Sequence, residues 1–175
     1  MAVLRIVTWG DPVLRKVSRP VEPHEFDEVL RAWCQDLAET LYEAEGVGLA
    51  AVQVNNPIRV LVVDTQYPDS GRREPVVYVN PVIEPAGPAC DIDEGCLSVP
   101  GVRGKVNRPE RINISWQDTF GAPHRREGID GMEARCLQHE LDNLEGVVFV
   151  DRLSPAARSL AAGKLRRLAA QAAGR

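Results

Sequence analysis

The order of the apolar segments is the feature that most constrains how this chain can fold. Residues 24–45 place apolar side chains at helical spacing, and the pattern stops at Gly46. Three short runs rich in β-branched residues follow, at residues 59–63, 76–79 and 112–116. Because strand-like runs outnumber helical segments and do not alternate with them regularly, the order predicts an α+β fold with mostly antiparallel sheet.

The last third of the chain adds two further helices to this prediction. The pattern predicts a helix over residues 131–144, a short strand over 147–150 and a helix over 155–173. The most exposed loop is expected at residues 66–74. No internal repeat or long linker divides the sequence, so we expect one domain over residues 1–175.

Composition and charge exclude several classes of protein. No run approaches the roughly 18–20 consecutive apolar residues that span a bilayer, and the first residues lack the features of a signal peptide. We therefore expect a cytoplasmic protein without a membrane partner. The net charge of −4 is too small to predict nucleic-acid binding by the whole chain. From Ser154 onward, however, the sequence has five basic residues and no acidic one.

Four cysteines, Cys34, Cys90, Cys96 and Cys136, are irregularly spaced. In a cytoplasmic protein of this size, such spacing predicts packing, metal-binding or nucleophilic roles rather than a disulfide framework. Cys34 falls on the apolar face of the first predicted helix and is expected in the core.

The helix predicted near the end of the chain contains a His-Glu pair, His139 and Glu140. Met132, Cys136, His139 and Asn143 share one stripe of this helix. In the HExxH pattern, two histidines one turn apart bind a divalent metal, and the glutamate handles protons. Here Asn143 stands where that pattern has its second histidine. A structural histidine beside a surface glutamate is the alternative interpretation of the pair by itself.

Two other segments favour the metal-site interpretation of the His-Glu pair over the structural one. Residues 46–53 read Gly-Val-Gly-Leu-Ala-Ala-Val-Gln, and residues 94–98 read Glu-Gly-Cys-Leu-Ser. Together with Gln-His-Glu at 138–140, and in this order, they resemble the three signature motifs of peptide deformylases. Members of that family remove the N-formyl group from the initiator methionine of nascent bacterial proteins and release formate. The resemblance implies an α+β fold whose third motif lies on a central helix facing a sheet.

The resemblance also implies a metal centre. The family holds one divalent metal, usually Fe(II) and replaceable by Ni, Co or Zn, through one cysteine and two histidines. Cys96 and His139 match two of these ligands, and Asn143 occupies the position of the third. Glu140 matches the general acid and base of the family.

Further roles follow from the same match. Gln53 and the backbone N–H of Leu97 match the groups that polarise the formyl oxygen, and Gly48 lies where the substrate backbone pairs. Glu94 and Arg103 look like a buried ion pair that orients the loop carrying Cys96. The positions that match the methionine pocket are Val47, Ile92, Met132 and Cys136.

Asn143 is the departure from the family pattern. An amide oxygen is a weaker donor than imidazole for iron or zinc, so we expect weaker metal binding. Three outcomes stay open: Asn143 Oδ1 or a water completes the site, the Asp142 carboxylate moves in, or the metal is lost. In the last case the chain is a metal-poor pseudo-enzyme that binds N-terminal peptides without turnover. A generic zinc peptidase of the HExxH type is a further alternative.

The resemblance also suggests a role for the basic C-terminal segment, residues 155–175. In the family, a C-terminal helix can bring the enzyme to the ribosome, and phosphate-rich RNA attracts positive charge. The expected partners are therefore N-formylmethionyl peptides and the ribosome, the latter resting on charge alone.

Overall fold

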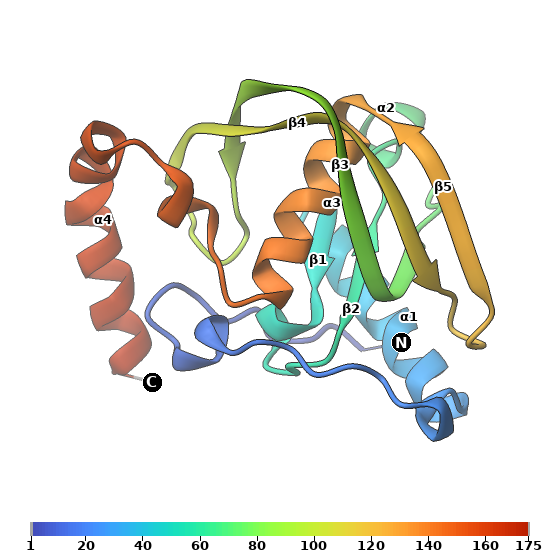
Figure 1. The fold of residues 1–175 in the computed structure, drawn as a ribbon. Coiled ribbons are helices and arrows are strands. Elements are labelled where there is room, and N and C mark those ends of the chain that lie inside the picture. The colour runs from blue at the N-terminus through green and yellow to red at the C-terminus, as the bar shows by residue number, and fades with distance from the viewer. Residues whose placement is uncertain (1, 175) are drawn as a thin grey trace.

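The fold is described by a computed structural model that covers residues 2–174 (Figure 1). The helices over these residues are α1 (Glu28–Glu43), α2 (Tyr67–Ser70), α3 (Gly131–Leu144) and α4 (Pro155–Ala173). The strands are β1 (Gly48–Ala50), β2 (Val60–Val63), β3 (Val76–Gly95), β4 (Arg103–Gln117) and β5 (Pro123–Ile129). Short 3-10 turns lie at Pro12–Arg15, Pro23–Glu25, Ala51–Val54 and Phe149–Arg152.

The five strands form one sheet whose spatial order follows the chain order, β1-β2-β3-β4-β5. Every neighbouring pair is antiparallel. The β3–β4 pair is the longest, and its register places Glu94 opposite Gly104 and Gly95 opposite Arg103. The predicted α+β fold with antiparallel sheet is therefore confirmed, although β3 and β4 extend well beyond the predicted runs at 76–79 and 112–116.

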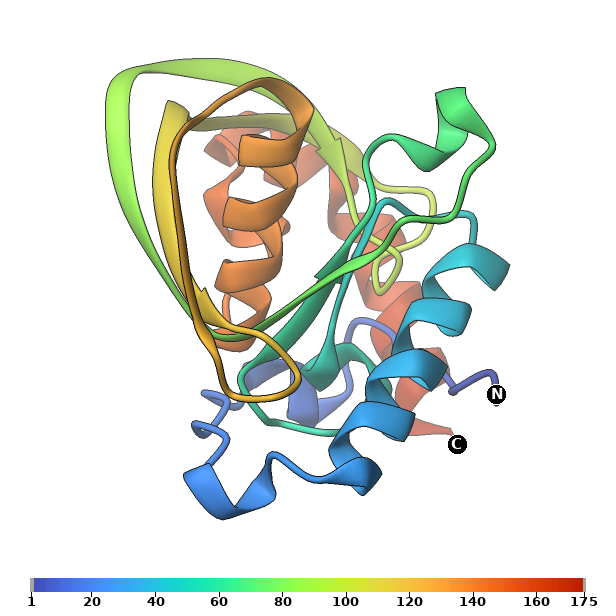
Figure 2. The same ribbon diagram turned by 90° about the vertical axis from the view of Figure 1, so that its right-hand side faces the viewer.

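Strand β2 separates two apolar clusters because its side chains alternate between the faces of the sheet. Val60 and Val62 belong to the cluster that contains α1, and Leu61 and Val63 to the cluster that contains α3. Figure 2 shows this arrangement, with α3 inside the curve of the long strands and α1 on the other side of β2. The central position of α3 expected from the family resemblance is thus observed.

Helix α1 begins four residues later than the apolar pattern predicted. The Asp27 carboxylate accepts a hydrogen bond from the backbone N–H of Leu30 at 2.9 Å and caps the helix there. Pro23–Glu25 instead forms a separate 3-10 turn. Cys34 is buried on the inner face of α1, as expected for a core residue.

The strand predicted over residues 147–150 is wrong. This segment leads into the 3-10 turn Phe149–Arg152, in which the Asp151 carboxylate accepts a hydrogen bond from the Val148 N–H at 3.0 Å. Phe149 and Val150 are apolar because they fill the core beside α3, and not because they pair with a strand.

Helix α4 lies at one side of the molecule (Figure 1). Leu165 is its buried residue, whereas Leu160 is 90% exposed. Gly10 allows close approach to this helix, since a Cβ at Gly10 would meet Ala169 Cα at 2.5 Å. Within residues 2–174, no helix has both the length and the apolar character needed to cross a bilayer.

Candidate active site

A cavity of about 520 Å³ lies where β1, the β3–β4 turn and α3 meet. All three sequence motifs contribute to it. From the first motif come Val47 and Gly48, and from the second come Cys96 and Leu97. Helix α3 supplies Met132, Arg135, Cys136, His139 and Glu140.

Cys96 and His139 converge inside this cavity. The His139 Nδ1 atom lies 2.9 Å from Glu94 Oε2, and the same imidazole also has the Cys96 side chain as a hydrogen-bond partner. Burial by itself lowers the pKa of His139, but the hydrogen bonds to Cys96 and Glu94 outweigh it and raise the pKa well above its ordinary value. A cysteine from the β3–β4 turn and a histidine from α3, far apart in the sequence, therefore lie side by side in the cavity.

Glu94 holds the His139 ring in place and is itself bound by two arginines. Its carboxylate accepts two hydrogen bonds from Arg108, at 2.7 Å and 3.0 Å, and one from Arg135 at 3.3 Å. Burial raises the pKa of Glu94, yet the hydrogen bonds from His139 and Arg108 and their charges lower it to about 2. Glu94 is thus a permanent anion that fixes the orientation of the His139 ring.

Glu140 has a different environment. It is 4% exposed, and its one side-chain hydrogen bond among the described residues comes from Asn143 Nδ2 to Oε2, at 3.0 Å. Burial raises the pKa of Glu140, and the nearby charge of His139 and the Asn143 bond only partly oppose this. A buried carboxylate with a raised pKa suits a group that accepts and returns a proton.

Gly48 is required at its position by the approach of α3. A Cβ at Gly48 would lie 2.4 Å from Cys136 Sγ and 2.9 Å from Glu140 Oε1. Burial, with the charge of Glu140 nearby, raises the pKa of the Cys136 thiol well above its usual value, so Cys136 acts here as an apolar residue.

Gln53 lies behind Cys96 and is not among the residues that line the cavity. Its Oε1 accepts a hydrogen bond from the Ala50 N–H at 2.8 Å, which fixes the amide. Its Nε2 then donates to Ser98 Oγ at 3.1 Å and to Cys96 Sγ at 3.5 Å. The amide N–H group therefore faces the sulfur.

The predicted methionine-pocket residues all line the cavity: Val47, Ile92, Met132 and Cys136. Cys136 is buried and Val47 half-buried, whereas Ile92 is 37% and Met132 57% exposed. The last two thus stand at the mouth of the cavity.

Comparisons with known proteins agree with this geometry. The family model described as "Polypeptide deformylase" matches residues 3–159. A peptide deformylase of Novosphingobium aromaticivorans is 42% identical over 96% of this chain and 98% of its own length. One from Brucella suis is 41% identical over 99% of this chain and 97% of its own.

Solved structures lead to the same family. The crystal structure of a peptide deformylase from Legionella pneumophila matches with a TM-score of 0.86 and 40% identity, covering 99% of both chains. A Synechococcus elongatus peptide deformylase in complex with actinonin matches with a TM-score of 0.85 and 39% identity, over 92% of this chain and 87% of its own.

This chain belongs to the polypeptide deformylase family. The family prediction from the three motifs is therefore confirmed. Deformylase relatives match over nearly the whole chain, and these matches give no support to a pseudo-enzyme that binds peptides without turnover.

One prediction about the deformylase site is wrong, namely the ion pair between Glu94 and Arg103. Arg103 is largely exposed, and its Nε donates to Asp93 Oδ2 at 2.6 Å on the surface. The partner of Glu94 is instead Arg108, which is 4% exposed. Strand alternation explains the difference, because Val106 and Arg108 face the interior of β4 whereas Arg103 lies on the opposite face.

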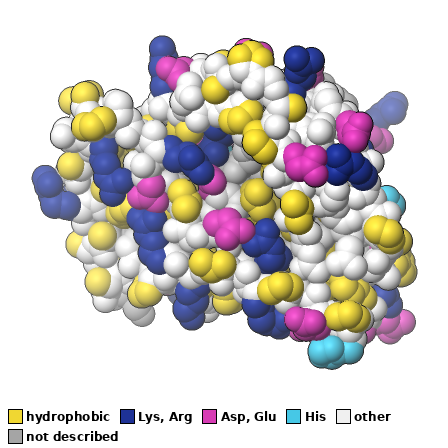
Figure 3. All heavy atoms as spheres, viewed as in Figure 1, with side chains coloured by type: hydrophobic (Ala, Val, Ile, Leu, Met, Phe, Trp, Pro, Cys, Tyr) yellow, Lys and Arg dark blue, Asp and Glu magenta, His cyan; other side chains and the backbone are white. Residues whose placement is uncertain are grey.

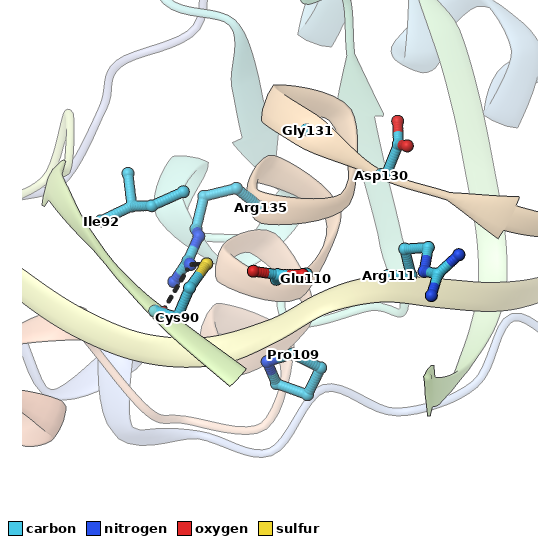
Figure 4. A pocket seen from close by; sticks show the side chains of 8 residues that line it. All are labelled: Cys90, Ile92, Pro109, Glu110, Arg111, Asp130, Gly131 and Arg135. Carbon is cyan, nitrogen blue, oxygen red and sulfur yellow. Dashed lines mark hydrogen bonds between the residues drawn. The ribbon is translucent and has the colours of Figure 1, made fainter. Parts of the chain in front are cut away.

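Arg135 is a second residue that the sequence reasoning missed. Besides Glu94, it donates to the Val106 carbonyl at 2.9 Å and to the Cys90 carbonyl at 2.9 Å. Its guanidinium also reaches Cys90 Sγ at 3.3 Å, and Figure 4 shows the two side chains pointing toward one another in a second cavity of about 500 Å³. The signal in the sequence was the buried Glu94 itself, which requires cations nearby.

Asp142 is committed to two arginines and is not free to move into the site. Its Oδ2 accepts from Arg108 Nη1 at 2.7 Å, and its Oδ1 from Arg152 Nη2 at 2.7 Å. The alternative in which Asp142 becomes a metal ligand would break both ion pairs. The other two histidines lie elsewhere: His24 is in the Pro23–Glu25 turn, and His124 hydrogen-bonds Asp118.

The metal that the family implies can be tested against these donors. No group of three His, Cys, Asp or Glu side chains within residues 2–174 is arranged to hold a metal. Cys96 and His139 nevertheless form a thiol–imidazole pair, and Glu94 fixes the ring as carboxylates do for metal-binding histidines. The pair fits a divalent transition metal. Asn143, at the expected third position, is buried one turn further along α3 and is not among the residues that line the cavity.

Proposed function

We propose that this chain hydrolyses the N-formyl amide of formyl-methionyl nascent peptides and releases formate. The observation that carries this proposal is the convergence of Cys96, His139 and Glu140 on one cavity beside β1. Membership of the deformylase family supplies the reaction class. All three motifs contribute residues to this cavity, which is why we assign the reaction to it.

Cys96 and His139 would hold the metal, with Fe(II) as the native ion and Zn, Ni or Co as substitutes. A thiolate and an imidazole suit these ions. When bound, such a metal lowers the pKa of a water molecule and polarises a carbonyl group. We place the reaction in the cytoplasm, because a thiolate ligand needs a reduced cysteine and all four cysteines are free.

Glu140 carries the proton in this proposal. Its raised pKa lets it accept a proton from the attacking water and return it to the amine that leaves. The Leu97 N–H and Gln53 Nε2 donate to the formyl oxygen as negative charge develops on it. Gln53 Nε2 would use for the formyl oxygen the hydrogen that it donates to the Cys96 sulfur in this structure, at 3.5 Å.

The peptide would bind along the free edge of β1. Among the described strands β1 lies at the end of the sheet and pairs with β2, so its other edge can accept an extended chain. Gly48 keeps this edge close to Glu140, as the clash distances of an added Cβ indicate. The methionine side chain would fill the apolar part of the cavity between Val47 and Cys136, with Ile92 and Met132 at its mouth.

The experiment that tests this function measures formate release from formyl-Met-Ala-Ser. The protein is purified without oxygen and loaded with Fe(II), and acetyl-Met-Ala-Ser serves as the control substrate. We expect turnover with the formyl peptide alone, and a loss of about 10²–10⁴-fold in the Glu140→Gln variant. Metal-loaded protein that releases no more formate than Glu140→Gln would contradict the proposal.

We also propose that α4 contacts the ribosome. In Figure 3, Lys and Arg side chains lie on α4 and are also spread across the rest of the face shown. Arg158 is paired with Asp151, whereas Arg166 and Arg167 are exposed and form no ion pair within residues 2–174. These two arginines can therefore attract phosphate groups.

Charge reversal tests this contact better than truncation, because deleting α4 would uncover the core around Leu165. The Arg166→Glu/Arg167→Glu double variant should lose co-sedimentation with ribosomes at low salt. The control, Arg72→Glu/Arg111→Glu, changes the charge equally at exposed positions elsewhere. Equal binding by both double variants would show that α4 is not the contact.

A further inference from the structure

Asn143 is an unusual residue for its position. It lies one turn after His139 on the buried face of α3 and is 3% exposed. Asparagine is a weak helix former, and burying an amide is unfavourable unless it is hydrogen-bonded. Its Nδ2 donates to Glu140 Oε2 at 3.0 Å, which satisfies the donor end of the amide.

The acceptor end is free. Within residues 2–174, no hydrogen bond reaches Asn143 Oδ1, and the one fully enclosed side-chain N or O atom without a partner is Ser18 Oγ. Oδ1 is therefore not sealed inside the protein. Because Glu140 is a carboxylate that accepts hydrogen bonds, the amide is oriented with its NH₂ toward Glu140 and its oxygen away from it.

We propose that Asn143 works at both ends of its amide: Oδ1 is the third ligand of the metal held by Cys96 and His139, and Nδ2 positions Glu140. This proposal rests on the proposed function and deepens it. An imidazole that binds a metal through one nitrogen keeps a single N–H, on the far side of its ring. The amide instead carries its oxygen and its NH₂ on one carbon, so the ligand and the Glu140 donor are adjacent.

The donor set that results is a thiolate, an imidazole and a neutral amide oxygen. Its total charge equals that of one cysteine with two histidines, but the oxygen is harder and weaker than the nitrogen it replaces. The site should therefore bind metal more weakly than one with a second histidine, while Glu140 stays held by a donor that histidine would not provide at this place.

The metal end is tested by Co(II) titration of the apo-protein without oxygen. The absorption of the Cys96–Co(II) bond reports binding, and the d–d bands report the number of ligands. We expect Asn143→Ala to weaken Co(II) binding by about 10–100-fold and change the d–d bands, and Asn143→His to strengthen it. Glu145→Gln, an exposed change at the end of the same helix, is the control. An Asn143→Ala affinity within about twofold of the parent, with unchanged bands, would overturn the ligand role.

The Glu140 end is tested with Asn143→Asp, which keeps an oxygen at the metal and replaces the donor with a like charge. We expect Co(II) affinity at least equal to that of the parent. At saturating metal, kcat should fall by about 10-fold or more while KM for formyl-Met-Ala-Ser is unchanged. An unchanged kcat would overturn the positioning role, and weaker Co(II) binding would overturn the ligand role.

The same data separate this proposal from the proposed function. Metal binding that depends on Asn143, in a protein that releases no formate, would refute the deformylase activity and leave the ligand role standing. Formate release by a protein whose Co(II) affinity does not change when Asn143 is substituted would support the deformylase activity and refute the ligand role.

Discussion

Glu94 hydrogen-bonds His139, Glu140 follows His139 in α3, and the two carboxylates are almost equally buried. Glu94 is held by Arg108, Arg135 and His139, and its pKa is lowered to about 2 against the effect of burial. Glu140 is held by one neutral amide, from Asn143, and burial raises its pKa. The pKa values of two carboxylates in one site are thus shifted in opposite directions.

The comparison shows that burial alone does not decide what a carboxylate does. Two guanidinium groups make Glu94 a fixed charge that orients His139, and a group that never protonates near neutral pH cannot carry a proton. Glu140 lacks such partners and keeps a pKa suited to proton transfer. The arginines around Glu94 therefore give it a supporting role, while proton transfer is left to Glu140.

The largest expected effect comes from exchanging each carboxylate for an amide. Glu94→Gln leaves Arg108 and Arg135 buried without their anion and should lower the free energy of unfolding by about 3–5 kcal/mol. Glu140→Gln should leave it unchanged or raise it, because ionising that buried group is unfavourable. Urea unfolding of the apo-protein measures both.

The control for this pair is Glu84→Gln. Glu84 lies on the same strand, β3, and binds Arg125 through two hydrogen bonds at the surface. An exposed pair of this kind contributes about 0–1 kcal/mol. If Glu94→Gln were no more destabilising than Glu84→Gln, the assignment of Glu94 as the structural anion would be wrong.

The next largest effect is the pH dependence of stability that the lowered pKa of Glu94 causes. A carboxyl whose folded pKa is depressed stabilises the protein above its unfolded pKa and loses that contribution as pH falls through the folded pKa. For Glu94 the fall from 4.5 to about 2 corresponds to about 3 kcal/mol. As the pH falls below 4.5, the stability difference between the parent and Glu94→Gln should shrink, because the Glu94 carboxylate loses its advantage over the unfolded chain there. A difference independent of pH would contradict the low pKa.

The smallest effect concerns the close packing of Gly48 against Glu140. Gly48→Ala places a methyl group against Cys136 Sγ and Glu140 Oε1 and should destabilise by about 1–3 kcal/mol, with a loss of kcat. Gly163→Ala, on α4, meets no atom nearer than 3.9 Å and should stabilise by about 0.5–1 kcal/mol. A Gly48→Ala variant as active and stable as the parent would show that Glu140 is free to move.

Much of the fold could be predicted because its signals are local. The apolar periods of α1, α3 and α4 and the β-branched run of β2 each lie within one short segment. The strand predicted at 147–150 failed because a short apolar run has the same composition in a buried turn as in a strand. The side-chain cap at Asp27, which shortened α1, was also local and could have been found.

The sequence by itself determined the family and the kinds of chemical group at the site: a thiol, an imidazole, a carboxylate and an asparagine where a histidine is expected. Only the tertiary structure decided how these groups pair. Glu94 meets Arg108 and Arg135 across β3, β4 and α3, and strand alternation turns Arg103 away from it. These pairings set the opposite pKa shifts of Glu94 and Glu140. They join residues far apart in the chain, and a carboxylate's pKa depends on the charges that folding brings near it and not on its neighbours in sequence.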